Sequence, residues 1–369
     1  MDFFNLKSFH HTRCWFEMRG NVSSAEPAAE SQQSKMSEPD IETGLLTIII
    51  TTSPTPSAPS TELVSSVIDS LPSSLHKLNL IISFDGFTIS SDSRGRLKKG
   101  QIPQSMAETY PPYIENVKSL FNTVVTPERF DDSTNAFISE AHNASGLHEG
   151  HITFIRHKYR QGFGFSVKVA LDYCRTPHVL VMQHDWKFVT PTPPLHDLLN
   201  IMITEDEVNY ITFIARLTVG YKKSTGKYHN RQTAVFEASL QLRSNRPHPN
   251  ELLACLHFFD RPHLCTVSLY RKIFSLNVVR QGGFIEDTLG CQYLSTIVSA
   301  PSNEESVLKW LTFGCWIYYP GDGTEVAIRH LSGRTNLTKA EQEARIRNLI
   351  RENRLRKLNE GHCGGSDEA

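Results

Sequence analysis

Short apolar runs that end in polar residues alternate with stretches of helical periodicity in this sequence. This alternation constrains the fold more than any other feature. The first run, residues 46–51, is β-branched and ends at Thr52, Ser53 and Pro54. Similar runs follow at residues 78–84, 151–155 and 179–182. Apolar runs without polar alternation are typical of strands that are buried on both faces of a parallel sheet.

Helical spacing separates these runs. After Ser60 and Thr61, either of which can cap a helix, apolar residues recur at helical intervals from residue 63 to residue 71. A second helix is expected to open at Gly162. The order strand, helix, strand predicts βαβ units, and hence an α/β fold with a mainly parallel sheet flanked by helices. Later strands are expected at residues 210–214, 264–268 and 317–319, with a helix at 302–314.

The composition divides the chain into three parts. Residues 1–43 are expected to form a disordered tail, because residues 21–40 hold hardly any aliphatic side chain to repay the entropy of ordering. Residues 44–335 are expected to form one large domain, interrupted by an insertion at 87–147 that contains one helix at 112–121. Residues 336–369 are expected to form a basic helix, opened by a capping box at Thr338 and Glu341, and a disordered end.

Charge and cysteine usage narrow the class of protein. The chain has 38 Lys and Arg against 39 Asp and Glu, so it has no global attraction for nucleic acid, which we do not expect as a partner. The seven cysteines include no CxxC pair, which argues against a zinc ribbon or a disulfide framework. With neither a secretory signal nor a 20-residue apolar segment in sight, we expect a soluble, cytoplasmic enzyme, and an organelle transit peptide remains open.

Polar residues follow four of the predicted strands. They are Thr52 and Ser53, Asp85, the basic loop at 156–164, and His184 with Asp185. Ligands of open parallel α/β sheets bind beyond the carboxyl ends of the strands. The basic loop and the start of the next helix could face a phosphate, or the loop could simply be solvated.

In this order, the pieces resemble the family 2 glycosyltransferases, which have the GT-A fold. They are Thr52-Ser53-Pro54, Asp85-Gly86, Gln161-Gly162-Phe163-Gly164 with Lys168, the run ending in Gln183-His184-Asp185-Trp186, and Glu286-Asp287. The resemblance covers residues 45–334. It implies transfer of a sugar from a nucleotide sugar to an acceptor hydroxyl, with inversion, and leaves open whether the acceptor is a glycan, a protein or a small molecule.

The resemblance also implies residue roles. A set of residues is expected to bind the nucleotide-sugar donor: Thr52, Ser53, Asp85, Gly162, Lys168 and Arg334. Asp185 corresponds to the last carboxylate of the family's Asp-x-Asp element, which binds a divalent metal, Mn or Mg, that bridges the diphosphate. His184 and His330 are expected as further metal ligands, and Gln183 stands where the family has its first Asp.

Glu286 and Asp287 match the family's acidic pair. The resemblance implies that Asp287, ahead of Glu286, is the general base that deprotonates the acceptor hydroxyl. The competing interpretation is an acidic pair that merely favours a helix start through the helix dipole.

Two other functions remain open. A GT-A-like module without full catalytic competence would serve as a binding or scaffold protein. Gln183, which stands in place of the family's first Asp, is consistent with this interpretation. A Rossmann-type enzyme that uses a dinucleotide or S-adenosylmethionine would place a third glycine where Val167 stands, so this reading is weaker.

Overall fold

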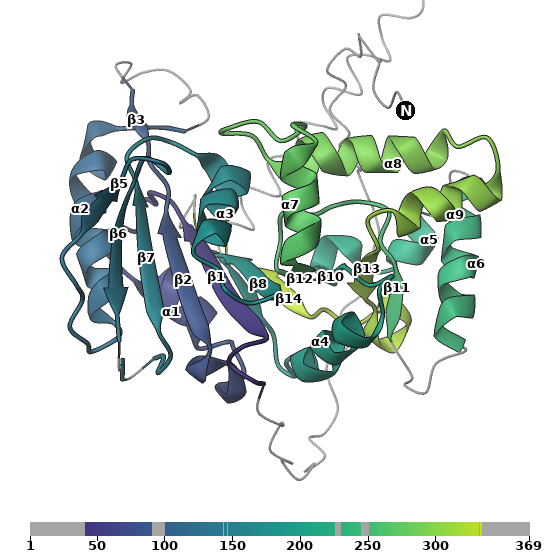
Figure 1. Ribbon diagram of the computed structural model, residues 1–369, viewed down its shortest axis with the longest axis horizontal. Coiled ribbons are helices and arrows are strands. Elements are labelled where there is room, and N and C mark those ends of the chain that lie inside the picture. Colours follow the sequence, from purple (N-terminus) through teal and green to yellow (C-terminus); the bar gives the residue numbers. More distant parts are fainter. Residues whose placement is uncertain are drawn as a thin grey trace, which may run out of the picture.

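A computed structural model describes residues 41–90, 100–142, 144–145, 147–225, 230–244, 251–331 and 333. A ten-stranded sheet runs through the whole molecule (Figure 1). Its strand order is β11-β13-β10-β12-β8-β1-β2-β7-β6-β5. The predicted N-terminal tail up to residue 40, the C-terminal basic helix and Arg334 lie outside the described residues.

The four apolar runs form the centre of this sheet. They are β1 (Leu46–Thr52), β2 (Asn79–Phe84), β7 (Ile152–His157) and β8 (His178–Gln183), which lie side by side and parallel in the order β8-β1-β2-β7. Every residue of β1 is buried. The predicted parallel core is therefore confirmed, and its apolar runs reflect burial on both faces.

Strands of mixed direction extend the core on both sides. On one side lie β12 (His263–Thr266), β10 (Tyr210–Phe213), β13 (Cys315–Tyr318) and β11 (Leu252–Ala254). On the other lie β6 (Ala136–Ala141) and β5 (Arg129–Asp131). Only β12, β11 and β6 run opposite to the other strands of this sheet, so the sheet is mainly parallel, as predicted.

Helices cover both faces of the core. The helix α1 (Glu62–Ile68) joins β1 to β2, and α3 (Gly162–Asp172) joins β7 to β8. They lie on opposite faces in Figure 1. This follows from the preference for right-handed crossovers, because the two connections step across the sheet in opposite directions.

Six further helices lie in the C-terminal half of the described chain. They are α4 (Leu195–Thr204), α5 (Tyr221–Thr225), α6 (Asn230–Ser244), α7 (Val267–Ser275), α8 (Cys291–Val298) and α9 (Asn303–Leu311). The start of α9 confirms the helix predicted from residue 302, because the Ser302 hydroxyl accepts a hydrogen bond from the Glu305 N–H. Single turns of helix lie at η1 (Ser73–Lys77), η2 (Arg216–Thr218), η3 (Glu286–Gly290) and η4 (Pro320–Gly323).

Residues 87–147, which we expected as an insertion, form part of the main architecture. They contribute β5 and β6 to the large sheet and the long helix α2 (Gln104–Ser119) at its side (Figure 1). The helix begins at Gln104 rather than near residue 112, because Tyr110 and Tyr113 continue its buried face across Pro111 and Pro112. The sequence reads as a helix start at the two prolines, and packing overrides that signal.

Two small sheets complete the fold. One pairs β3 (Thr88–Ile89) with β4 (Gln101–Ile102), and the other pairs β9 (Trp186–Phe188) with β14 (Ile328–His330). The described cysteines are free thiols. None of the helices in the described ranges is both long and apolar enough to cross a membrane.

Candidate functional site

Three predicted site residues share one level of the sheet. In the parallel ladders, Thr51 pairs with Gln183 of β8, and Thr52 pairs with Phe84 of β2. The residues that follow β8 and β2 therefore flank the end of β1, and the His184 N–H donates to the Thr51 carbonyl at 2.9 Å. The backbone supports it, because the Asp85 N–H donates to the Thr52 carbonyl at 2.8 Å.

Asp185 and His330 form a close pair at this edge. The Asp185 Oδ2 atom lies 3.1 Å from the His330 Nε2 atom, although 145 positions separate them in the sequence. The antiparallel pairing of β9 with β14 places His330 opposite Trp186, and their rings lie 4.8 Å apart. Asp185 is buried, whereas the His330 side chain is 45% exposed. The pair therefore lies at a boundary between the interior and solvent.

The chain after β14 continues across this pair. The Leu331 N–H donates to the Asp185 carbonyl at 2.7 Å. A Cβ atom on Gly333 would come within 2.9 Å of the Asp185 Cβ and 3.2 Å of the His184 Nε2. Glycine at 333 therefore permits this close approach. Within the described ranges, no group of three ligand atoms within 4.8 Å of one another includes Asp185, so His184 does not complete a compact three-residue metal site.

Thr52 binds a tyrosine beside the pair. The Thr52 Oγ1 and Tyr113 Oη atoms are 2.8 Å apart, and both residues are buried. Burial, with a smaller contribution from the negative charge of Asp185, raises the pKa of Tyr113 to about 12, although the hydrogen bond to Thr52 opposes the rise. Tyr113 is thus a protonated phenol close to Asp185. The sequence did not identify Tyr113 as a site residue, because it lies in α2, within the segment 87–147 that was expected to be an insertion.

Asp85 binds the start of α3. Its Oδ1 accepts a hydrogen bond from the Gln161 N–H at 2.6 Å, and its Oδ2 accepts one from the Gly162 N–H at 3.0 Å. Burial raises the pKa of Asp85, and these two bonds oppose the rise. The N–H groups that were expected to face a phosphate thus bind a carboxylate of the chain itself.

The loop at Gly162 also holds the segment that leads to Glu286. Gly162 has a φ of +74°, and a Cβ atom there would lie 2.7 Å from the Gly282 Cα. The Arg160 Nη2 donates to the Gly282 carbonyl at 2.8 Å, and the Gly282 N–H donates to the Gln161 carbonyl. Asp85 is therefore linked through this loop to the acidic segment.

Glu286 and Asp260 bind each other's backbone. The Asp260 N–H donates to the Glu286 Oε2 at 3.3 Å, and the Glu286 N–H donates to the Asp260 Oδ1 at 3.2 Å. Burial raises the pKa of both carboxyl groups, that of Asp260 far above its ordinary range, and for Asp260 the neighbouring charge of Glu286 adds to the effect. Gln183 joins them, because its Nε2 donates to the Asp260 carbonyl at 2.7 Å.

Asp287 lies at the surface beside this pair. It is exposed, and it stands in η3, a single π-helical turn that precedes α8. Such turns occur frequently at functional sites. The charge of Asp287 contributes to the raised pKa of Asp260, so the two carboxyl groups are close. The acidic pair from the sequence is thus an exposed Asp beside a half-buried, tethered Glu.

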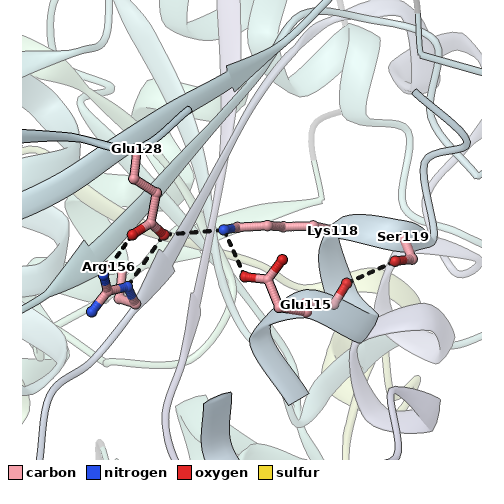
Figure 2. A network of polar contacts seen from close by, with 5 residues as sticks. All are labelled: Glu115, Lys118, Ser119, Glu128 and Arg156. Carbon is pink, nitrogen blue, oxygen red and sulfur yellow. Dashed lines mark hydrogen bonds and ion pairs between the residues drawn. The ribbon is translucent and has the colours of Figure 1, made fainter. Parts of the chain in front are cut away.

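Arg156, the first cation of the basic loop, forms an internal ion pair. Arg156 binds Glu128 through its Nε and Nη2 atoms at 3.2 and 2.5 Å, and Glu128 also accepts from the Lys118 Nζ at 3.0 Å (Figure 2). These cations lower the pKa of Glu128. His157 is buried and lies 2.9 Å from the Ser83 Oγ. Arg156 is therefore neutralised within the chain, whereas Lys158 is exposed, and the phosphate-facing role of the loop stays a prediction.

Lys168 lies apart from the other predicted donor-binding residues. It is exposed on α3, and its Nζ lies 5.1 Å and 5.9 Å from the ring centroids of Phe165 and Phe274. It therefore faces α7 in the structure, while its role in donor binding remains a prediction. Arg334 is outside the described residues.

A groove opens beside Asp85. It has a volume of about 1160 Å³ and lies between α2 and the ends of β6 and β7. Asp85, Phe87 and Tyr110 line one end, and the charged network of Figure 2 lines the other. The groove thus offers aromatic surface and a carboxylate at the edge of the sheet where Thr52 ends β1.

Comparison with known proteins gives remote structural neighbours. No protein-family model matches the chain, and no curated protein matches it. Glucosyl-3-phosphoglycerate synthase from Mycobacterium tuberculosis is 13% identical with a TM-score of 0.28, over 61% of this chain and 57% of that one. TarS from S. aureus is 8% identical with a TM-score of 0.34, over 77% and 36%. The mannosyltransferase PcManGT from Pyrobaculum calidifontis is 10% identical with a TM-score of 0.33, over 76% and 58%.

The chain spans between 36% and 58% of the length of these neighbours. At such identities and TM-scores, we base the function of this chain on its own site.

Two buried residues of the site were missed in the sequence. Asp260 anchors Glu286, and the neighbouring Arg261 donates through Nε and Nη1 to the hydroxyls of Thr212 and Thr218 at 3.2 and 2.9 Å. Arg261 is buried, and its desolvation lowers its pKa. An adjacent acid and base directly before a strand, in an otherwise apolar stretch, is the signal that could have drawn attention to them.

The donor atoms at the Asp185 and His330 pair suit a divalent metal. Two adjacent ligands of an octahedral ion, each about 2.1 Å from it, lie about 3.0 Å apart. The observed separation between Oδ2 and Nε2 is 3.1 Å. One carboxylate and one imidazole at this separation, which also allows a direct ion pair between them, are compatible with an ion such as Mn²⁺, which accepts oxygen and nitrogen ligands.

Proposed function

We propose that this chain is a glycosyltransferase that moves a sugar from a nucleotide-sugar donor to an acceptor hydroxyl, with inversion at the sugar. The observation that carries the proposal is the pairing of Asp185 with His330 at the carboxyl end of β8. It brings a carboxylate and an imidazole, both of which are common metal ligands, to the ends of the strands that also carry Thr52 and Asp85. The resemblance to family 2 glycosyltransferases predicts that Thr52 and Asp85 bind the donor and that Asp185 and His330 bind the metal.

A divalent ion held by Asp185 and His330 would neutralise the diphosphate as the glycosidic bond breaks. The buried Asp185 and the partly exposed His330 would hold the ion between the protein interior and solvent. Tyr113, protonated at neutral pH, can donate a hydrogen bond there. Among the neighbours above, the mycobacterial synthase structure contains Mn²⁺ and UDP, and the archaeal mannosyltransferase contains GDP-mannose and Mn²⁺. We therefore choose Mn²⁺, UDP-sugars and GDP-sugars as probes.

The groove beside Asp85 is where we place the nucleoside of the donor. The partly exposed ring of Phe87 offers a surface to a base, and the buried Tyr110 supports it through an edge-to-face contact. The Asp85 oxygens each accept one hydrogen bond from the backbone of α3, and each can accept another from a ribose hydroxyl or a base N–H.

Asp287 is our candidate for the general base. It is exposed and can reach an acceptor, whereas Glu286 is tethered to the Asp260 N–H. Asp287 would take the proton of the acceptor hydroxyl as its oxygen attacks the anomeric carbon and the nucleoside diphosphate leaves. Glu286 and Asp260 would position the turn that carries Asp287.

A second candidate is a GT-A-like binding protein without turnover. The bond from the Gln183 amide to the Asp260 carbonyl favours it, because a residue aligned with a metal-binding Asp here serves as a brace. Turnover decides between the two. Incubation with a panel of UDP-sugars and GDP-sugars and Mn²⁺ should release nucleoside diphosphate, and Asp287→Asn should abolish release. Donor binding without release by the unaltered protein, for every sugar and acceptor tried, would support the binding protein.

A further inference from the structure

A second cluster of side chains of the metal-ligand type lies at the opposite ends of the parallel strands, where β7 begins. Glu140 and His142 come from the end of β6 and the residue after it, and His151 precedes β7. β7 starts here and ends six residues later at the loop that binds Asp85, about 20 Å away at 3.3 Å per residue. The cluster is therefore separate from the Asp185 and His330 pair.

The strand register explains why the three side chains meet. Ala141 pairs with Ile152 in the antiparallel ladder, so the next pair outward is His142 with His151. Glu140 lies two residues before His142 and points to the same face, because side chains alternate along a strand. The arrangement thus follows from the backbone of two paired strands.

The geometry suits a small divalent ion. One ligand atom from each residue lies within 4.8 Å of the others. The His142 Nε2 is 3.9 Å from the Glu140 Oε2, and the two His rings are 4.6 Å apart. Ligands of tetrahedral zinc, at about 2.0 to 2.1 Å, are about 3.4 Å from one another. Rotation of partly exposed side chains, 61% exposed for His142 and 38% for Glu140, can close that difference.

We propose that Glu140, His142 and His151 bind a zinc-class divalent cation, with water as the fourth ligand. Two imidazoles and one carboxylate select Zn²⁺, and also Cu²⁺ and Ni²⁺, over Mg²⁺ and Mn²⁺. Arg175 acts electrostatically on His151 and opposes a cation, while the Glu140 carboxylate offsets it. A bound ion would join β6 to β7 and so stabilise the end of the sheet at which β5 and β6 are added.

The test measures zinc stoichiometry on the full chain after removal of metal with a chelator. We expect His142→Ala with His151→Ala to bind one equivalent of Zn²⁺ fewer than the unaltered protein, in a competition titration against a chromophoric chelator. The matched control is His196→Ala, which removes a partly exposed His on α4 and should retain the full stoichiometry. Circular dichroism verifies that each variant is folded.

Three results would overturn the proposal. They are equal zinc stoichiometry in the double variant and the unaltered protein, an equal loss in the His196 control, and loss of the same equivalent in Asp185→Asn instead. Co²⁺ gives an independent readout, because a tetrahedral site with nitrogen and oxygen ligands produces visible absorption bands that the double variant should lack. Because Mn²⁺ is the probe for the donor site, failure of that proposal would leave this zinc measurement unaffected.

Discussion

Asp260 and Glu286 hold each other through reciprocal bonds, in which the backbone N–H of each donates to the carboxyl group of the other at 3.3 and 3.2 Å. Because Gln183 donates to the Asp260 carbonyl, the end of β8, the loop before β12 and the turn that carries Asp287 form one connected unit. This link explains how residues from distant parts of the sequence reach a common edge.

The first prediction concerns Asp260. Burial raises its pKa far above the ordinary value of 3.8. A raised folded-state pKa contributes stability that is fully present below the unfolded pKa and is lost as pH rises toward the folded pKa. We therefore expect Asp260→Asn, which stays neutral and keeps an acceptor oxygen, to gain stability relative to the unaltered protein as pH rises from 4 to 8. Urea unfolding across this range measures it.

Asp260→Ala provides the contrast for this experiment. It leaves the Glu286 N–H without its acceptor, and should be about 1 to 3 kcal/mol less stable than Asp260→Asn at every pH. Parallel stability curves for Asp260→Asn and the unaltered protein would show that Asp260 is ionised without penalty.

A second prediction concerns Gly162. An alanine there must adopt a φ near +74° and bring its Cβ within 2.7 Å of the Gly282 Cα. We expect Gly162→Ala to destabilise the protein by about 2 kcal/mol or more, because strain and displacement of the facing loop add. Thermal unfolding measures the loss, and Gly44→Ala, where a Cβ meets nothing within 4 Å, is the control. Equal unfolding midpoints for the two variants would contradict this description of the loop.

The third prediction concerns acid sensitivity. Burial lowers the pKa of four histidines to about 4: His148, His157, His257 and His263. For a lowered His pKa, the stability contribution is present above the ordinary value of 6.5 and is lost as pH falls toward 4. The free energy of unfolding should therefore fall steeply over this interval. His157→Gln should flatten the curve by an amount on the order of 1 to 3 kcal/mol, and His196→Gln should not.

A fourth prediction separates the two acidic residues of η3. Asp287→Asn should abolish sugar transfer and leave donor affinity and stability unchanged, because the side chain is exposed. Glu286→Ala should instead lower stability, because it leaves the Asp260 N–H without the Glu286 carboxyl oxygen that accepts its hydrogen bond. Rates, donor affinity and unfolding are measured on both. Full turnover by Asp287→Asn would remove Asp287 from the base role.

The central part of the fold could be predicted from the sequence because each parallel strand is a short apolar run followed by polar residues. Residues 46–51 lack polar alternation, and Thr52, Asp85 and His184 each follow a buried run. Parallel strands carry the next polar residue to the same edge, so one-dimensional spacing suffices to expect a shared site. The approach of His330 to Asp185 was expected from the family resemblance alone.

The rest depends on long-range contacts that spacing does not encode. Pro111 and Pro112 mask the helix that carries Tyr113, which reaches Thr52 only through packing. The sequence of the basic loop suggests phosphate binding. In the structure, however, Glu128, which directly precedes the edge strand β5, forms an ion pair with Arg156. The pairing of Asp260 with Glu286 could not be predicted from the sequence, because it depends on the antiparallel placement of β12 beside β8.

The most direct test of the central claim is a calorimetric titration of UDP-sugars and GDP-sugars with and without Mn²⁺. The unaltered protein should bind at least one of these donors more tightly with Mn²⁺ present. Asp185→Asn and His330→Ala should each lose that metal-dependent gain, while Asp206→Asn, which alters an exposed carboxylate elsewhere, should retain it. Metal-dependent donor binding that survives in Asp185→Asn, or no donor binding by the unaltered protein, would contradict the account.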